Sequence, residues 1–316
     1  MKRFQSVGAL LSAITGLLAL VLVSAFTISA LSAYQREEQA RTVLSVVNGT
    51  RNIMTAKIAL RGELAVANLV LEAPEAAAPA TVARLRRLHA QSQTALDIVR
   101  REIAERSLAD ARSRLAILVR NDDAYRAIFS KVDAASQKSQ PERGASLLAD
   151  WKDVTTPLTH ELAVQSDILG ASVAGIDPFV DRMMKINDNA WNMRGNAGGE
   201  RGRMQTVVIG NRIPDPALQR SLAEFNGMID ARWSDIEVEA LRSSMPQPLK
   251  AVIADARKVY FTDYRAMRDG LLARLMAGQK LSMSGQDFVE ASNPGLSRML
   301  AIPATALDLT GKHAKE

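Results

Sequence analysis

Apolar residues recur at spacings of three and four along most of this 316-residue chain, and this pattern predicts long α-helices. The first stripe lies between residues 43 and 71: Val43, Val46, Ile53, Leu60, Leu64, Ala67 and Leu71. Thr50 and Lys57 interrupt it. No glycine or proline stands between Ala33 and Val43, so we expect this helix to continue without a break from the segment before it.

That preceding segment, residues 8–33, carries no charge over 26 positions. A helix of this length, at about 1.5 Å per residue, exceeds the roughly 30 Å of a bilayer core. Lys2 and Arg3 precede the segment, although Arg36 and Arg41 follow it. The positive-inside rule then predicts a single-pass protein of the inner membrane, with residues 1–7 in the cytoplasm and the bulk of the chain in the periplasm.

A cleaved signal peptide is the alternative interpretation of residues 8–33. Small residues around Ala30 and Ser32 would suit a signal peptidase. The apolar stretch is longer than the usual core of about 7 to 15 residues in such peptides. The length therefore favours an uncleaved transmembrane signal anchor, and under either interpretation the remaining chain is exported.

Three further stripes follow before residue 175. One comprises Val82, Leu85, Leu88, Ala95, Val99 and Ile103. The next, with Ser107 as its expected N-cap and Asp122 as a polar intrusion, comprises Leu108, Ala111, Leu115, Leu118, Tyr125, Phe129 and Val132. The last is expected to open at Gln140-Pro141 and comprises Leu148, Trp151, Leu158, Leu162 and Leu169.

The same order of helix signals returns after residue 176. Asp177-Pro178 opens a long helix, and breaks follow at Pro214 to Pro216, Pro246 to Pro248 and Gly278 to Gly285. Short connections make neighbouring helices antiparallel. The expected fold is therefore all-α: a transmembrane helix followed by two tandem up-down four-helix bundles, residues 34–175 and 176–316.

An internal repeat supports this division. Residues 61–74, RGELAVANLVLEAP, align with residues 201–214, RGRMQTVVIGNRIP, at an offset of 140. Further on, Tyr125-Arg126 matches Tyr264-Arg265 at an offset of 139, and Trp151 matches Phe288 at 137. Matches in one order with nearly constant spacing indicate a duplicated unit of about 140 residues.

Composition excludes several classes of function. The chain has no cysteine and three separated histidines, so we expect no metal site, and no motif for another cofactor is present. The net charge of +6 comes from Lys and Arg interleaved with Asp and Glu, and aromatics make up 4%, so nucleic acid is not an expected partner. No nucleophile and base, or phosphate loop, can be assembled, and we expect no enzyme and no catalytic residue.

The repeat also allows the two copies to be compared. At the position of Leu60 the second copy has Glu200, and at that of Met54 it has Arg194. Arg194 and Arg201 are seven residues apart and project from nearly the same face, where they could converge on one anion. The predicted ligand-binding residues are Arg194, Glu200, Arg201, Arg203 and the matching Arg61, in a small-anion pocket inside the second bundle.

We expect Glu200 to pair with one of these arginines or with the surroundings of the ligand. The function is expected where the copies differ, at Arg194 and Glu200, more than at the arginine that they share. The alternative is that the charged side chains reach the bundle surface and form ordinary ion pairs.

Glycines are concentrated in residues 192–202, NMRGNAGGERG, although each costs a helix about 1 kcal/mol relative to alanine. Gly195, Gly198, Gly199 and Gly202 fall at i, i+3, i+4 and i+7. We expect them to form a face that allows another backbone or a ligand to approach closely. A broken helix whose amides bind an anion, or a flexible loop, are the alternatives.

The segment AGGERGRM at 197–204 resembles the Glu-Arg-Gly motif of nitrate- and nitrite-sensing (NIT-type) domains, and the wider chain resembles the periplasmic region of bacterial methyl-accepting chemotaxis proteins. The first copy departs from the motif, with Leu60 before Arg61-Gly62. The resemblance implies paired four-helix bundles that bind nitrate or nitrite through arginines between helices, a homodimer, and a downstream or partner signalling domain. Receptors of this type return through the membrane, so an exit helix would be expected after residue 316.

These observations together predict the exported sensory domain of a membrane-anchored bacterial signal-transduction receptor. Its expected ligand is a small anion such as nitrate, nitrite or a small carboxylate, and signalling is expected to occur by helix displacement. The alternative is a helical envelope adaptor that binds another protein and senses nothing.

Overall fold

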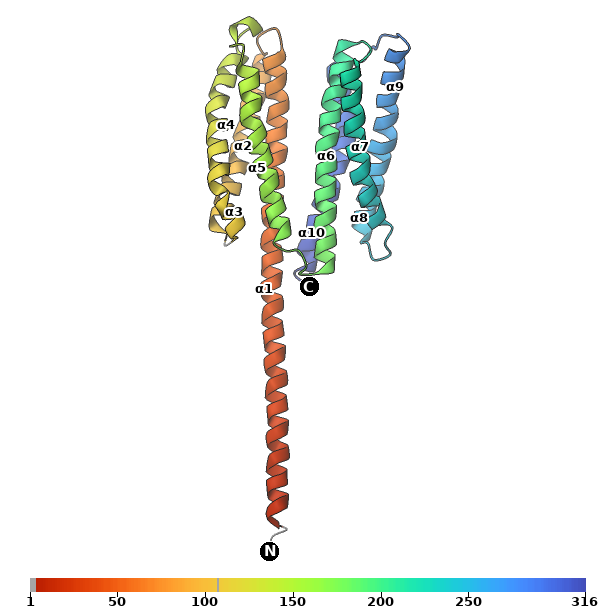
Figure 1. The fold of residues 1–316 in the computed structure, drawn as a ribbon. Coiled ribbons are helices and arrows are strands. Elements are labelled where there is room, and N and C mark those ends of the chain that lie inside the picture. Colours follow the sequence, from red (N-terminus) through yellow and green to blue (C-terminus); the bar gives the residue numbers. More distant parts are fainter. Residues whose placement is uncertain (1–3, 107) are drawn as a thin grey trace.

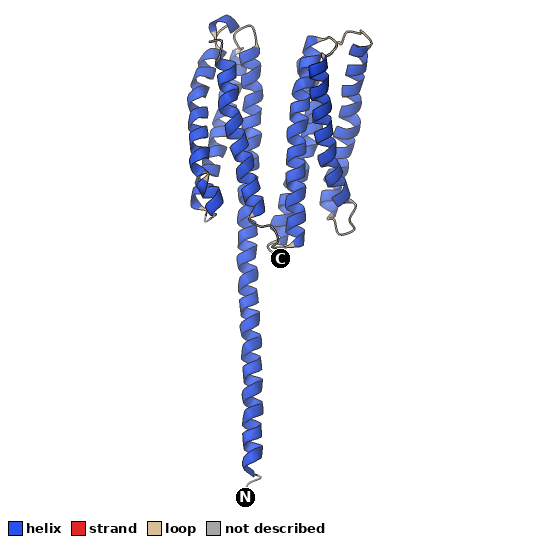
Figure 2. Ribbon diagram, viewed as in Figure 1, coloured by secondary structure: helices blue, strands red, loops and turns tan. Residues whose placement is uncertain are grey.

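The computed structural model describes residues 4–106 and 108–316, and within these ranges the chain is helical apart from short connections, with no strand (Figure 2). The prediction of an all-helical chain is confirmed. Lys2 and Arg3, and the expected N-cap Ser107, lie outside the described residues. The helices are α1 (Phe4–Glu72), α2 (Pro79–Glu105), α3 (Ala109–Ser113), α4 (Leu115–Ser136), η1 (Gln140–Glu142), α5 (Leu147–Ala171), α6 (Pro178–Gly210), α7 (Pro216–Ala240), α8 (Gln247–Ala256), η2 (Arg257–Tyr264), α9 (Arg265–Met276) and α10 (Gly285–His313).

The first helix, α1, runs for 69 residues without a break, as the absence of glycine and proline between Ala33 and Val43 predicts. Its N-terminal part projects far beyond the other helices (Figure 1). It is the one helix in the described ranges that is long and apolar enough to span a membrane. Large apolar side chains from Leu10 to Leu31 are exposed, whereas burial against other helices begins at Val43.

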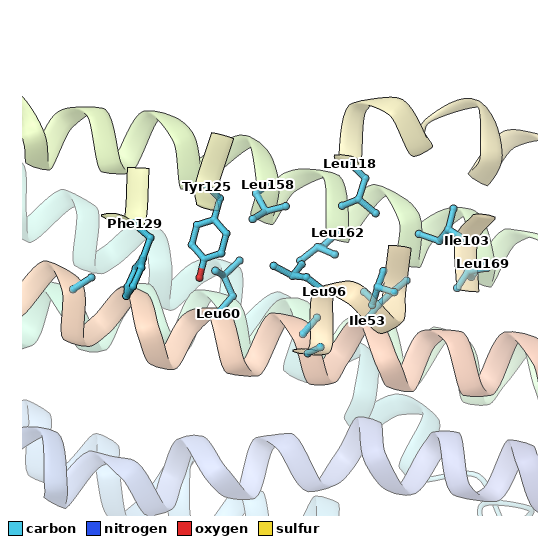
Figure 3. Close-up of a cluster of buried hydrophobic side chains, with 14 of the residues drawn as sticks. Ile53, Leu60, Leu96, Ile103, Leu118, Tyr125, Phe129, Leu158, Leu162 and Leu169 are labelled. Atoms are coloured by element: carbon cyan, nitrogen blue, oxygen red, sulfur yellow. The ribbon is translucent and has the colours of Figure 1, made fainter. Parts of the chain in front are cut away.

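The upper part of α1 packs with α2, α3, α4 and α5 around one hydrophobic core, and we call this set the N-terminal helix group (Figure 1). Leu60, Leu96 and Leu162 lie in the middle of this core, and Tyr125 points its hydroxyl toward α1 (Figure 3). The buried residues are those that the apolar stripes predict, because side chains three and four positions apart share one side of each helix.

Two helix starts in this group differ from the predicted ones. The third stripe does not form one helix, because the backbone leaves regular geometry at Arg114, whose guanidinium binds the buried Glu161 carboxylate of α5 at 2.6 and 3.0 Å. Pro141 does not open α5. It lies in the separate turn η1, which Ser139 and Glu142 close with a reciprocal capping interaction, and α5 begins at Leu147.

The second half of the chain forms the C-terminal helix group, in which α6, α7, the continuous run α8–η2–α9, and α10 surround a second core. Three helices of this group have an N-cap side chain that accepts backbone N–H bonds: Asp177 for α6, Asp215 for α7 and Ser284 for α10. Residues Arg257–Tyr264 are wound as a π-helix, which places Tyr260 and Tyr264 in the core.

The two groups lie side by side and are joined by residues 172–177 (Figure 1). They touch through α1 and α10, where Arg51 pairs with Asp308 and Gly311 packs against Val47. The C-terminus consequently lies beside α1, close to the point where α1 leaves the N-terminal helix group (Figure 1).

Candidate functional site

A cleft of about 460 Å³ opens between the two helix groups. Three helices supply its walls: α1 and α5 from the N-terminal helix group and α6 from the C-terminal helix group. We call it the inter-group cleft. It is lined by Lys57, Arg61, Leu64, Thr155, Thr156, Thr159, His160, Ala163, Trp191, Asn192, Gly195 and Asn196.

Two cations of α1, Lys57 and Arg61, define one wall of the cleft. They are one helical turn apart and therefore project from the same face of the helix. Lys57 is 4% exposed, and its Nζ lies 4.6 Å from the ring centroid of Trp191 on α6. The guanidinium carbon of Arg61 lies 5.0 Å from the same centroid. Both cations thus rest on one aromatic ring, which gives a favourable but weak interaction.

A third cation, Arg194, reaches the same region from α6. Its Nε is buried and has no hydrogen-bond partner. The charges of Arg61 and Arg201 are both close enough to lower its pKa. Arg201 itself donates to the side-chain oxygen of Asn293 on α10 at 2.8 Å. The structure therefore places Arg194 close enough to both Arg61 and Arg201 to be affected by their charges, while Arg201 itself contacts α10.

No carboxylate oxygen of a described residue lies within 4.0 Å of the charged atoms of Lys57, Arg61 or Arg194. Burial, followed by the charge of Arg61, lowers the pKa of Lys57 to about 8. Burial lowers the pKa of Arg61 as well, and burial together with Arg61 and Arg201 lowers that of Arg194 to about 10. In each case burial penalises the charged form, and the neighbouring charges do not offset this penalty.

The nearest carboxylates compensate this charge only in part. Asp167 and Asp188 raise the pKa of Lys57, but burial and Arg61 outweigh them. Asp188 is held by Asn187, whose amide donates to Oδ1 at 2.9 Å. Burial, reinforced by Asp167, raises the pKa of Asp188 to about 6, so this carboxylate is itself poorly stabilised as an anion. The cleft therefore carries an excess of positive charge near neutral pH.

Glu200 lies elsewhere, which corrects the prediction that it pairs with Arg194 or Arg201. It is fully buried in the core of the C-terminal helix group, where Arg268 of α9 donates to it at 2.9 Å. The hydroxyls of Tyr264 and Tyr260 donate to its other oxygen at 2.9 and 3.3 Å. Six residues along a helix turn a side chain by about 120° from the starting face, so Glu200 cannot share a face with Arg194.

Arg203 is also separate from the cleft. It is exposed, donates to the hydroxyl of Ser221 at 3.0 Å and lies 4.9 Å from the ring of Phe225, both on α7. The five predicted ligand-binding residues therefore do not gather in one place in the second half of the chain. Arg61, which the two copies share, lines this cleft, whereas Glu200, at which they differ, does not.

The glycine-rich segment is an unbroken part of α6, which excludes a loop or nest there. Its glycines do not meet one common partner, which corrects the prediction of a shared close-approach face. A Cβ atom on Gly195 would lie 3.1 Å from the Arg61 guanidinium, and one on Gly199 would lie 2.6 Å from the Phe225 ring. Gly198 faces Arg194 of its own helix, and Gly202 is open. Gly195 alone borders the cleft, where it makes room for Arg61.

Sequence reasoning missed several residues of this region. Lys57 stood out only as an interruption of an apolar stripe, although its spacing of four from Arg61 was a usable signal. The buried carboxylate of Glu63, in the core of the N-terminal helix group, has no signal in the periodicity either. It accepts a hydrogen bond from the Tyr125 hydroxyl and lies 2.9 Å from Nδ1 of His89, whose ring stacks on Phe129. Its partner Tyr125 is the residue that aligns with Tyr264.

This arrangement can hold an anion, because Lys57 and Arg61 are adjacent, Arg194 is nearby, and no carboxylate of a described residue pairs with them. No family model, curated protein or solved structure matches this chain.

Proposed function

We propose that this chain is the exported sensory region of a membrane-anchored signal-transduction receptor, and that it binds a small anion in the inter-group cleft. The observation that carries the proposal is the burial of Lys57 in the cleft without a carboxylate partner. This lysine is 4% exposed, lines the cleft, and has no described carboxylate within ion-pair distance. It lies on α1, the helix that also contains the candidate membrane span.

The energetics favour a bound anion. An isolated buried charge costs several kcal/mol unless it is paired. An anion held between Lys57 and Arg61 would supply that pairing, and Arg61 can offer two parallel N–H donors to a planar oxyanion or carboxylate. Arg194 would add long-range attraction from α6. Nitrate, nitrite and small carboxylates all have the required charge and planarity.

Signalling would follow from the position of the cleft. A ligand bound to Lys57 and Arg61 on α1 and to Asn192 or Asn196 on α6 would draw the two helix groups together. Because α1 continues into residues 8–33 without a break, any displacement of its upper part is transmitted to the membrane. The ligand would shift the balance between two packing arrangements by the difference in its affinity for them.

The wider architecture belongs to the same proposal: two copies of one four-helix bundle, facing the periplasm, in a receptor that acts as a homodimer. The repeat is supported by equivalent roles at aligned positions. Tyr125 and Tyr264 each donate to a buried glutamate, and Trp151 and Phe288 are each fully buried. The resemblance to NIT-type and chemotaxis-receptor sensor regions supports the sensory role and the orientation.

Calorimetry on the full chain in lipid nanodiscs tests the proposal. We expect at least one of nitrate, nitrite, acetate and propionate to bind, and Lys57→Met with Arg61→Met to abolish that binding. Lys131→Met is the matched control, because Lys131 is an exposed lysine of α4 far from the cleft. Failure of every anion to bind, or undiminished binding in the double variant, would refute the proposal.

A further inference from the structure

The walls of the inter-group cleft differ in hydrogen-bonding character, and we infer from this that its ligand is a small hydroxycarboxylate and not a bare inorganic oxyanion. This inference rests on the proposed function, since it names the class of anion that the same cleft would take. It depends on Thr156 and Thr159 of α5, which line the same cleft as the two cations of α1.

The size of the cleft is the first observation. Its volume of about 460 Å³ falls in the range of about 300 to 1,000 Å³ that is usual for sites of organic ligands. Nitrate has only four heavy atoms and would contact Lys57 and Arg61 while leaving the α5 wall to water. A ligand that touches both walls must extend beyond its anionic group.

The second observation is the state of the hydroxyl groups on α5. Thr155 donates its hydroxyl hydrogen to the carbonyl of Trp151 at 2.8 Å, and Thr156 donates to that of Lys152 at 2.7 Å. Thr159 donates to the carbonyl of Thr155 at 2.9 Å. A hydroxyl has one hydrogen to donate, so each oxygen keeps only its capacity to accept.

The two walls of the cleft therefore offer opposite hydrogen-bonding groups. Lys57 and Arg61 offer hydrogen-bond donors and positive charge to a carboxylate, whereas Thr156 and Thr159 offer acceptors to a donor on the same molecule. Thr156 is exposed and Thr159 half-buried, so their oxygens are accessible from the cleft, unlike the buried Thr155. Bare nitrate, nitrite or acetate has no donor with which to use this wall.

The electrostatics select the kind of donor. An ammonium group would suit the threonine oxygens, but it would enter a cleft that already holds Lys57 and Arg61, with Arg194 nearby. The ammonium group and these cations would repel each other, and burial strengthens the repulsion. A neutral hydroxyl meets the same oxygens without that penalty, so a hydroxy acid fits better than an amino acid.

Calorimetry on the full chain in nanodiscs, with matched pairs of ligands, tests the inference. Lactate and 3-hydroxybutyrate would be compared with propionate and butyrate, which lack only the hydroxyl, and with alanine and nitrate. We expect at least one hydroxy acid to bind about tenfold more tightly than its deoxy partner, the effect of one added hydrogen bond. Alanine and nitrate should bind more weakly than that hydroxy acid.

The variant Thr156→Val/Thr159→Val keeps the shape of the wall and removes its acceptors. It should reduce the preference for the hydroxy acid to less than about threefold and leave the affinity for the deoxy partner unchanged. Thr94→Val is the control, because Thr94 on α2 makes the same bond to its own helix, at 2.9 Å to Ala90, outside the cleft. A melting temperature within a few degrees of the original would establish that each variant is folded.

The outcomes separate the two proposals. If propionate or nitrate binds but neither hydroxy acid gains over its partner, the inference on ligand class fails and the sensory proposal stands. The inference also fails if the threonine variant keeps the preference, or loses affinity for all ligands equally. If no anion in the panel binds, both proposals fail together.

Discussion

Lys57 occupies a position that the periodicity of its helix assigns to the interior, since it lies in the apolar stripe between Ile53 and Leu60. A lysine there is neither solvated nor paired, and its pKa is lowered to about 8, mainly by burial. The protonated form is thus less stable in the folded protein than in the unfolded chain. Such a residue weakens the fold unless something else compensates it.

Replacement of Lys57 by methionine should consequently stabilise the protein in the absence of ligand. Methionine fills a similar volume without the charge. We expect the free energy of unfolding at pH 7 to rise by roughly 1 to 3 kcal/mol, from the lowered pKa of the lysine. Thermal denaturation in anion-free buffer measures this. Lys131→Met should change stability by less than about 0.5 kcal/mol, and a destabilised Lys57→Met protein would show that the lysine has a partner when no ligand is added.

Anion affinity should depend on pH through the same group. The charged form of Lys57 prevails below its pKa of about 8, so affinity should be highest there and should fall as the pH rises above 8. The groups that act on Lys57 are Arg61, which opposes its charge, and Asp167 and Asp188, which favour it. Asp188, with a pKa raised to about 6, should further increase affinity below pH 6 as it loses its negative charge.

Calorimetry from pH 5.5 to 9.5 checks this dependence, and buffers of different ionisation enthalpy would detect the proton that Lys57 takes up on binding near pH 8. Lys57→Arg keeps the charge at every pH in this range and serves as the control. An affinity that is constant between pH 7 and pH 9.5 would exclude Lys57 as a ligand-binding cation.

For single residues, the sequence predicts part of the site. Arg194 and Arg201 do share a face, because seven residues return a helix to within about 20° of its starting direction. Periodicity cannot tell, however, which face of α6 meets the other helix group and which meets its own core. Periodicity therefore groups Glu200 with the arginines. It gives no sign that Lys57 lines a cleft, because the cleft forms only when residues 134 positions apart, such as Lys57 and Trp191, come together.

Helix α6 contains four glycines within residues 195–202, and these lower its intrinsic stability. Two of them have opposite surroundings. A Cβ atom on Gly199 would lie 2.6 Å from the Phe225 ring, whereas one on Gly202 would meet nothing within 4 Å. The first glycine allows α7 to pack closely, and the second has no such role in the structure.

Alanine substitutions should separate these roles. Gly202→Ala should raise the free energy of unfolding by about 1 kcal/mol, because alanine favours the helix. Gly199→Ala should lower it by about 1 to 3 kcal/mol, because the added methyl group displaces Phe225. Urea denaturation of the two variants gives both values. Equal effects of the same sign would mean that the α6–α7 packing described here is wrong.

The run α8–η2–α9 is fixed to α6 by its buried polar contacts. Arg268 donates to Glu200 at 2.9 Å and to Asn226 at 2.6 Å, and two tyrosines of the π-helical segment donate to the same carboxylate. Burial, reinforced by Glu200, raises the pKa of Tyr260 and of Tyr264 and keeps both phenols protonated. Sequence periodicity did not predict this π-helix, because the apolar spacing of three and four is that of an ordinary α-helix.

Arg268→Met should remove the counter-charge of Glu200 and destabilise the protein by about 3 to 5 kcal/mol. Adding Glu200→Gln should restore part of the loss, because the second change removes the unpaired charge. Arg274→Met, on the exposed side of α9, should have an effect of less than about 0.5 kcal/mol. Denaturant titration measures all three, and a double variant no more stable than Arg268→Met would argue against a direct pair.

In the whole molecule, the two helix groups meet along α1, with the cleft above and the contact between Arg51 and Asp308 nearer the membrane end. Local periodicity indicated the helices and their breaks well, because each helix buries one side in its own core. It carries no information on how the two groups lie against each other, because a buried side chain such as Leu307 of α10 joins the core of the other group, which only the assembled structure shows.

Binding in the cleft should change the distance between the groups near the membrane. The chain has no cysteine, so spin labels can be placed at Arg36→Cys on α1 and Lys312→Cys on α10 without background labelling. Pulsed electron paramagnetic resonance in nanodiscs measures the distance between the two labels. This distance should change by about 1 to 2 Å when the protein is saturated with the anion that binds most tightly, as in other helix-shift transitions. The pair Ala65→Cys and Lys131→Cys, within one group, should not shift, and an unchanged first distance would exclude signalling by displacement of α1.

Because α1 is unbroken, its geometry determines how large a displacement reaches its N-terminal segment. Side chains of α1 are buried from Val43 onward, Glu38, Arg41 and Thr42 border the end of α2, and the large apolar side chains from Leu10 to Leu31 are exposed. The helix would therefore pivot near Val43. The cleft lies about 24 Å above this pivot and the middle of the apolar segment about 34 Å below it, at about 1.5 Å per residue. A straight rod of these proportions is a lever with a mechanical gain of about 1.4. A movement too small to alter either core could thus be enlarged, and reversed in direction, by the time it reaches the bilayer.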